Sequence, residues 1–196
     1  MGTSRLEAFS DGVIAILITI MVLDLRLPAG PDLASLRMAA PTILLYLLSF
    51  VLLGIYWNNH HHMLQATDRI SGAVLWANLH LLFWLSLVPY ATRWMGESHF
   101  ASLPTAAYGV VLILAAIAYT ILQNRIIALQ GRDSRLARAV GNDMKGYASL
   151  AAYALAIPAA FINPWISCGL YALVALIWLV PDPRIEHVLN GGVTPP

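Results

Sequence analysis

Long runs of apolar residues alternate with short polar segments along the whole chain. Six runs approach the roughly 20 residues that an α-helix needs to cross a membrane. They cover about residues 6–27, 36–59, 70–93, 102–129, 144–161 and 165–180. The connections carry prolines and glycines, as in "PAGPD" after the first run and "VPDPR" after the last. The pattern predicts an all-α membrane protein with six transmembrane helices.

The chain of 196 residues is short enough to be one domain. We expect a six-helix transmembrane domain over residues 1–182 and a short tail over 183–196, where "NGGVTPP" indicates disorder. The first apolar run could be mistaken for a signal peptide. Acidic Glu7 and Asp11 stand at its start and no small-residue cleavage site follows, so we expect it to be retained as the first helix.

Basic residues are distributed unevenly between the two sets of loops. With a cytoplasmic N-terminus, the cytoplasmic side holds Arg5, Arg69, Arg125, Arg132, Arg135, Arg138, Lys145 and Arg184. The opposite side holds Arg26, Arg37 and Arg93. Cytoplasmic loops of membrane proteins are enriched in lysine and arginine. Both termini are therefore expected in the cytoplasm.

Composition agrees with a membrane protein. The chain is 59% hydrophobic and 11% charged, with a mean hydropathy of +0.71, whereas soluble domains carry about 25% charged residues. A net charge of +1 provides no strong field for binding nucleic acid. The single cysteine, Cys168, cannot form an intrachain disulfide and lies in an apolar segment, where a packing role is expected.

The run His60-His61-His62 is the densest group of potential metal ligands. Successive side chains on a helix point about 100° apart, so the three cannot bind one ion, and no acidic residue follows at i+3 or i+4. A metalloenzyme would need several such runs. We expect no resident metal, no cofactor and no enzymatic activity, since phosphate loops, nucleophile elbows and zinc-protease motifs are also absent.

The first apolar run begins with an unusual polar turn. Arg5 stands just before it and Ser10 and Asp11 lie in its first turns, although ionisable groups at membrane depth are costly and often mark functional sites. On a helical wheel, one stripe contains Ile16, Ile20, Leu23 and Leu27. Ser10 and Asp11 project elsewhere. Because the helix is apolar all round, this periodicity alone does not decide what the stripe faces.

Three ordered motifs resemble the endolysosomal potassium channel family and its bacterial homologues. They are R-x-x-x-F-S-D-G from Arg5 to Gly12, "YWNNHH" from Tyr56 to His61, and "NLHLLFWLSLVPY" from Asn78 to Tyr90. The motifs lie in the first half of the chain, and the later helices resemble the family in number and length. One departure is Ile14, where bacterial homologues commonly have phenylalanine.

The resemblance implies a homotetramer in the bacterial plasma membrane, with the first helix of each chain lining a central pore. It assigns a hydrophobic constriction to Ile16, Ile20 and Leu23, narrowest at Ile16, and a hydroxyl layer to Thr19. An apolar ring can gate by dewetting. Potassium gives up its water more readily than sodium, so we expect a moderate preference for potassium. The expected partners are further copies of the chain, permeant potassium and membrane lipid.

The resemblance also implies that the polar turn anchors the pore helix to the second and third helices, in preference to conducting ions itself. The expected network comprises Arg5, Phe9, Ser10, Asp11, Trp57, His60 and Asn78, with Phe9 as a packing residue. Arg5 and Asp11 are six positions apart, so their pairing within one helix is not expected.

Two other interpretations stay open. A secondary transporter, with proton coupling as one form of it, would favour midplane ionisable residues and two broken helices. The chain contains Pro89 and Pro158 within apolar runs but few midplane charges. A non-conducting membrane scaffold or a membrane enzyme is supported by the histidine run alone.

Overall fold

The computed structural model describes residues 2–25, 28–141 and 143–179, which contain eight helices and no strand. In chain order these are α1 (Thr3–Leu23), α2 (Leu33–Gln65), α3 (Gly72–Ser86), α4 (Val88–Glu97), α5 (Ser102–Gln130), α6 (Arg135–Val140), α7 (Met144–Ala159) and α8 (Pro164–Leu179). Helices occupy all six predicted segments, so the all-α class is confirmed. Leu27, Arg26, Arg184 and the tail expected over 183–196 lie outside the described residues.

Within the described ranges, four helical stretches are long and apolar enough to cross a membrane: α1, α2, Gly72–Glu97 and α5. Helices α7 and α8 have 16 residues each, about 24 Å at 1.5 Å per residue, against a hydrocarbon core of about 30 Å. The chain is thus a multi-pass helical membrane protein, and the number of six spans stays a prediction.

The structure differs from the sequence expectation in the third segment and in the basic loop. The predicted third segment is two helices, because Pro89 has no N–H to bond the carbonyl group one turn earlier, and α3 ends at Ser86. Helical hydrogen bonding resumes where the Ala91 N–H donates to the Leu87 carbonyl at 3.0 Å. In the basic loop, an unpredicted short helix, α6, begins where the Ser134 side chain accepts from the Ala137 N–H.

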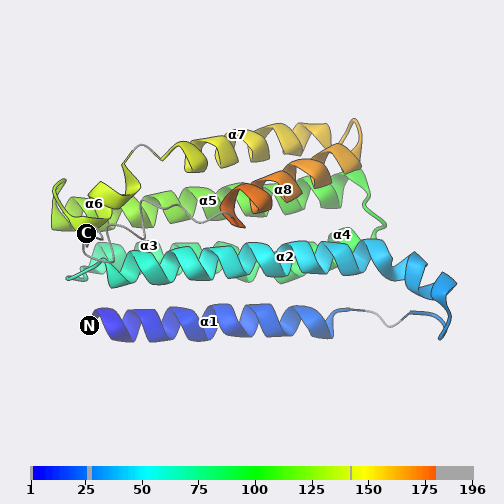
Figure 1. Ribbon diagram of the computed structural model, residues 1–196, viewed down its shortest axis with the longest axis horizontal. Helices are drawn as coiled ribbons and strands as arrows, with labels where there is room; N and C mark the ends of the chain where they lie inside the picture. The colour runs from blue at the N-terminus through cyan, green and yellow to red at the C-terminus, as the bar shows by residue number, and fades with distance from the viewer. Residues whose placement is uncertain (1, 26–27, 142, 180–196) are drawn as a thin grey trace, which may run out of the picture.

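The helices form a bundle in which α1 occupies one edge and α7 the opposite edge (Figure 1). Helix α5 is central, packing against α3, α4, α7 and α8, whereas α1 packs mainly against α2, α3 and α4. Fully buried side chains at the centre include Leu53, Leu81, Tyr108 and Leu112. The first turns of α1 and α3 and the last turns of α2 lie together, and we call this the N-terminal end of the bundle. It lies opposite the end that holds α4.

Candidate functional site

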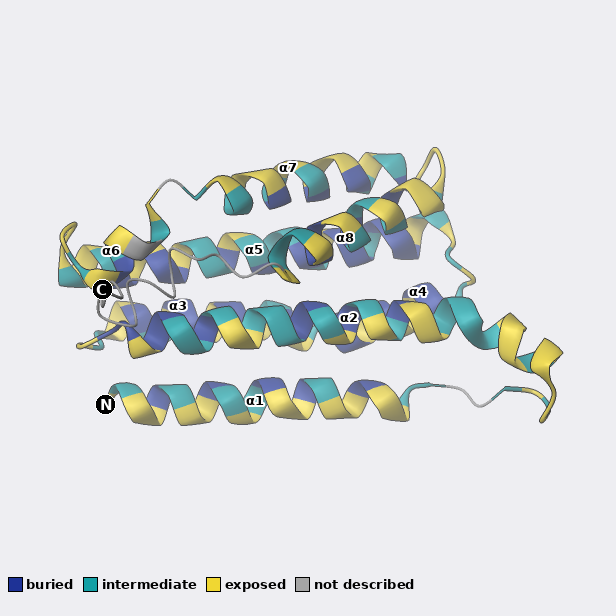
Figure 2. Cartoon of the chain, viewed as in Figure 1, coloured by how far each residue is buried: buried dark blue, intermediate teal, exposed yellow. Residues whose placement is uncertain are grey.

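Helix α1 has one buried side and one exposed side. The buried residues Leu6, Ser10, Ile14, Leu17 and Met21 recur every three or four positions and face the rest of the bundle. Figure 2 shows the exposed residues of α1 along the outer edge of the molecule, away from α2. The helix is therefore covered on one side only.

The exposed side of α1, which we call the α1 outer face, carries the predicted constriction residues. Ile16 is 57% exposed, Ile20 44% and Leu23 81%. Thr19 lies beside them, and its hydroxyl Oγ is 3.0 Å from the carbonyl oxygens of Ala15 and Ile16. Donating to these carbonyls uses the hydroxyl hydrogen, which leaves the oxygen lone pairs of Thr19 available to a ligand outside the helix.

Small residues share the α1 outer face. Ala8, Gly12 and Ala15 are exposed, and a side-chain carbon added at Gly12 would meet no other atom within 4 Å. Small residues at this spacing allow another helix to approach closely in a membrane. The α1 outer face thus combines bulky apolar side chains with a narrow strip where a neighbouring helix can pack.

Behind this face, three fully buried polar side chains connect α1, α2 and α3. Asn78 Nδ2 donates to Ser10 Oγ at 2.9 Å, and Ser10 Oγ donates to the Leu6 carbonyl at 2.9 Å. His60 Nε2 is 2.7 Å from Asn78 Oδ1. An amide oxygen only accepts, so His60 Nε2 carries the proton and donates. We call Ser10, His60 and Asn78 the buried relay.

A second group of polar contacts joins α1 to α2 nearer the surface. Trp57 Nε1 donates to Asp11 Oδ1 at 3.0 Å, and His61 Nδ1 lies 2.8 Å from Glu7 Oε1. The Glu7–His61 contact was not predicted. Arg5 and Phe9 are exposed on α1, and Arg5 makes no hydrogen bond or ion pair with any residue in the described ranges. The structure thus joins five of the seven predicted anchoring residues by hydrogen bonds, in two groups.

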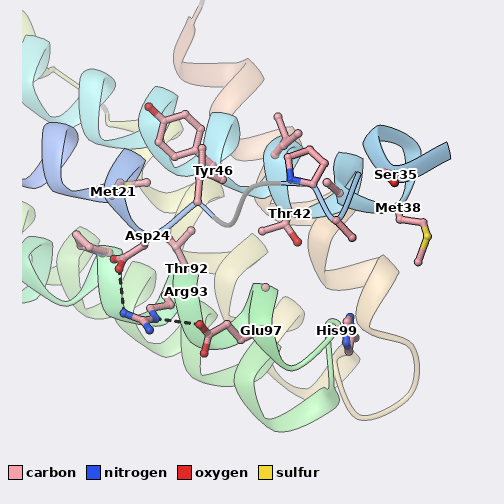
Figure 3. Close-up of a pocket in the computed structure, with 17 residues that line it drawn as sticks. Met21, Asp24, Ser35, Met38, Thr42, Tyr46, Thr92, Arg93, Glu97 and His99 are labelled. Atoms are coloured by element: carbon pink, nitrogen blue, oxygen red, sulfur yellow. Dashed lines mark hydrogen bonds and ion pairs between the residues drawn. The ribbon is translucent and has the colours of Figure 1, made fainter. Parts of the chain in front are cut away.

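The other end of α1 is held by an ion pair that sequence reasoning missed. Arg93 of α4 lies 3.0 Å from Asp24, just after α1, and 3.1 Å from Glu97 (Figure 3). These residues border a cleft of about 230 Å³ between the end of α1, the start of α2 and α4. The Arg93 side chain is half exposed. The charge distribution placed Arg93 on the side opposite the N-terminus, and Asp24 stands at the end of the first apolar run, which is the signal that could have paired them.

At the start of α2, Asp32 is the N-cap. Its carboxylate accepts a hydrogen bond of 2.6 Å from the Ser35 N–H, and this bond lowers the pKa of Asp32.

The arrangement provides a positioned apolar surface. On the α1 outer face, methyl-bearing side chains surround the Thr19 hydroxyl, while the hydrogen-bonding groups of Ser10 and Asn78 are engaged behind it. Such a surface can exclude or admit water and ions according to its distance from a facing surface.

Comparisons with known proteins agree on one family. A family model described as "Endosomal/lysosomal potassium channel TMEM175" matches residues 5–89, from α1 to the start of α4. The chain is 56% identical over 190 residues to a potassium channel of Chryseobacterium sp. (strain P1-3), covering 97% of this chain and 99% of that relative.

A solved structure is also similar. It is the crystal structure of a lysosomal potassium-selective channel TMEM175 homolog from Chamaesiphon minutus, with a TM-score of 0.80 and 27% identity. The alignment covers 91% of this chain and 96% of that chain. A vertebrate relative, the endosomal/lysosomal proton channel TMEM175 of Danio rerio, is 26% identical over 132 residues, covering 65% of this chain but 24% of the relative.

Proposed function

Because the chain belongs to the endosomal/lysosomal potassium channel TMEM175 family, we propose that it is a potassium-permeable channel of a bacterial plasma membrane. Four copies surround a central pore lined by the α1 outer face, and potassium is moderately preferred over sodium. Both termini lie in the cytoplasm, in line with the excess of basic loop residues on that side.

The observation that carries this proposal is the α1 outer face itself. Ile16, Ile20 and Leu23 stand exposed on an edge helix whose opposite side is fixed by the bundle. From Ile16 to Leu23 the axial rise is about 10 Å. Four such faces form an apolar throat of that length, which holds back ions when narrow and dry and conducts when it widens and fills with water.

Thr19 supplies the polar layer within this throat. Its hydroxyl hydrogen is directed to its own helix, so the oxygen presents lone pairs toward the pore axis. A ring of four such oxygens can replace part of the hydration shell of a cation. Potassium surrenders that water more readily than sodium, which gives the expected moderate preference.

The buried relay and the Asp11–Trp57 bond hold the pore helix in register. A polar side chain without a partner in this interior would be costly, and here Asn78 bonds both Ser10 and His60 Nε2 across three helices, while His60 Nδ1 has no hydrogen-bond partner among the described residues. We propose that these contacts, together with Asp24–Arg93 at the other end, set the position of α1 and take no direct part in conduction. Arg5 and Phe9, both exposed, face another copy of the chain.

Proton movement is the second candidate function. It is favoured by the contact between two titratable groups, Glu7 on the pore helix and His61 on α2, and by the name of the vertebrate relative. A proton channel or a proton-coupled transporter would produce a reversal potential that follows the pH gradient in place of the potassium gradient.

The test is electrogenic flux through purified protein in liposomes under opposing potassium and sodium gradients. The purified assembly should have a mass of about 86 kDa, four times the 21.4-kDa chain, after correction for detergent. The reversal potential should lean toward the potassium equilibrium potential. Ile16→Asn should increase flux or change this potential, because an amide hydrates the constriction.

Leu155→Asn is the matched control, since it places the same amide on an exposed position of α7, at the edge opposite α1. It should conduct like the wild type. The proposal fails if Ile16→Asn and Leu155→Asn behave alike, if the folded assembly carries no current in any variant, or if the potential follows protons alone.

A further inference from the structure

We propose that Glu7, Asp11 and His61 form a binding site for a divalent transition metal of the zinc class, at the N-terminal end of the bundle. One ligand atom from each residue lies within 4.8 Å of the other two. Glu7 and Asp11 are one turn apart on α1, so their carboxylates share a face, and His61 reaches them from α2. The site therefore bridges two helices.

The donor set matches this class of metal. Zinc in proteins is commonly held by imidazole nitrogen and carboxylate oxygen, with water as a fourth ligand where the site is open. Bonds of about 2.0–2.2 Å place tetrahedral ligands about 3.4 Å apart, so movements of about 1 Å close the site. The Glu7 and His61 side chains are 22% and 30% exposed, so water reaches both residues, while His61 Nδ1 itself is buried and would open to the ion as the side chains make these movements.

The His61 ring is already placed for binding. Its Nδ1 lies 2.8 Å from Glu7 Oε1, an ion-pair distance without the geometry of a hydrogen bond, so this nitrogen already faces the carboxylate with which it would share the metal. Its other nitrogen, Nε2, is 2.9 Å from the Gln65 amide. Metal-bound histidines usually donate their second N–H to an oxygen nearby. Rotation of the Gln65 amide supplies that oxygen.

The charge of the cluster also favours a cation. Two carboxylates one turn apart on a helix repel each other. Across the described ranges, neither is paired with an arginine or a lysine, and their polar partners are the Trp57 N–H and His61. A divalent cation would neutralise both carboxylates while Asp11 keeps its bond to Trp57 through the other oxygen. Along the sequence the cluster was invisible, because the acidic residues and the histidine lie on different helices.

The experiment is equilibrium dialysis of the purified full-length protein in detergent against zinc, with the metal measured per chain. Wild-type protein should bind about one zinc per chain. Glu7→Gln keeps the shape of the side chain, and His61→Ala removes the imidazole. Each should weaken binding by at least tenfold, since even changes to groups behind a metal ligand cost about that much.

His62→Ala is the matched control, because His62 is the next histidine in the run but lies outside the cluster. It should bind zinc like the wild type. Cobalt loaded into the wild type should give a visible absorption band that is lost in Glu7→Gln. If His61→Ala does not fold, Glu7→Gln and the cobalt band still decide the test. Absence of binding by the wild type, or equal losses in His61→Ala and His62→Ala, overturns the proposal.

A bound metal would join the pore helix α1 to α2. This consequence rests on the proposed function, whereas the dialysis measurement does not. A protein that binds zinc at this cluster but carries no current would support the site and contradict the channel.

Discussion

Asn78 is the residue on which the buried relay depends. It accepts a hydrogen bond of 2.7 Å from His60 and donates one of 2.9 Å to Ser10. Asn78→Ala removes both bonds. Ser10 keeps its bond to the Leu6 carbonyl, but the His60 N–H is left buried without a partner.

The expected loss follows from these contacts. Each buried hydrogen bond contributes about 1 kcal/mol net, and an orphaned buried donor costs about 1–3 kcal/mol. Loss of the bond to Ser10 costs about 1 kcal/mol and the orphaned His60 N–H about 1–3 kcal/mol, so we expect Asn78→Ala to lower the free energy of unfolding by roughly 2–4 kcal/mol. In a chain of this size, 1 kcal/mol corresponds to about 2–4 °C in melting temperature, so the shift should be roughly 5–15 °C.

Thermal unfolding of the purified protein, followed by tryptophan fluorescence, measures this shift. Asn58→Ala is the matched control, because Asn58 is exposed on the same helix as His60 and should change the melting temperature by about 2 °C or less. Melting temperatures for Asn78→Ala and Asn58→Ala that agree within about 2 °C would refute the reasoning, since the relay would then contribute nothing beyond an exposed amide.

Two further predictions concern other contacts. A methyl group at Gly109 would overlap the Tyr171 hydroxyl, so Gly109→Ala should destabilise the protein by about 1–3 kcal/mol. Gly54→Ala is the control, because no atom lies within 4 Å of the added carbon there, and it should not destabilise the protein. Thermal unfolding of the two variants measures the difference. The Ser35 N–H stabilises the charged form of Asp32, so the cap is present above about pH 4 and is lost as the pH falls through the lowered pKa of the folded state. Protection of the first-turn amides of α2 against hydrogen exchange, corrected for the slower intrinsic exchange at low pH, should therefore fall with pH in the wild type but not in Asp32→Asn, whose amide caps without a charge.

The helices were predictable because the length of an apolar run is a strong signal in a membrane protein. The expected segment 102–129 is Ser102–Gln130, and 144–161 is Met144–Ala159. The second helix runs further than expected, to Gln65, because His60, Met63 and Leu64 are buried and keep its polar last turns in place. Burial of a histidine depends on neighbouring helices, and no local pattern reports it.

The site was predictable to the extent that the family resemblance placed its residues. Ser10, His60 and Asn78 belong to three separate motifs, and the structure joins them by hydrogen bonds. The Glu7–His61 and Asp24–Arg93 contacts were missed because a contact between helices depends on how one helix is shifted along another. The spacing of residues within one helix carries no such information. The role of the α1 outer face stays a prediction.

The two ends of α1 are held in different ways. Buried hydrogen bonds fix Ser10, whereas the other end is held by an ion pair at Asp24 whose Arg93 side chain is half exposed. Exposed ion pairs contribute little, about 0–1 kcal/mol. A rotation of α1 about Ser10 would therefore keep the buried hydrogen bonds and would act on the Asp24–Arg93 pair and the apolar contacts at Met21.

Leu23 lies about 20 Å along the axis from Ser10 and Ile16 about 9 Å. A tilt of about 5° would move Leu23 sideways by about 1.7 Å and Ile16 by about 0.8 Å at this rise per residue. The displacement at Leu23 exceeds the 1.4 Å radius of a water molecule, while the buried relay is left intact. A small rotation would thus displace the Leu23 end of the α1 outer face about twice as far as the Ile16 position.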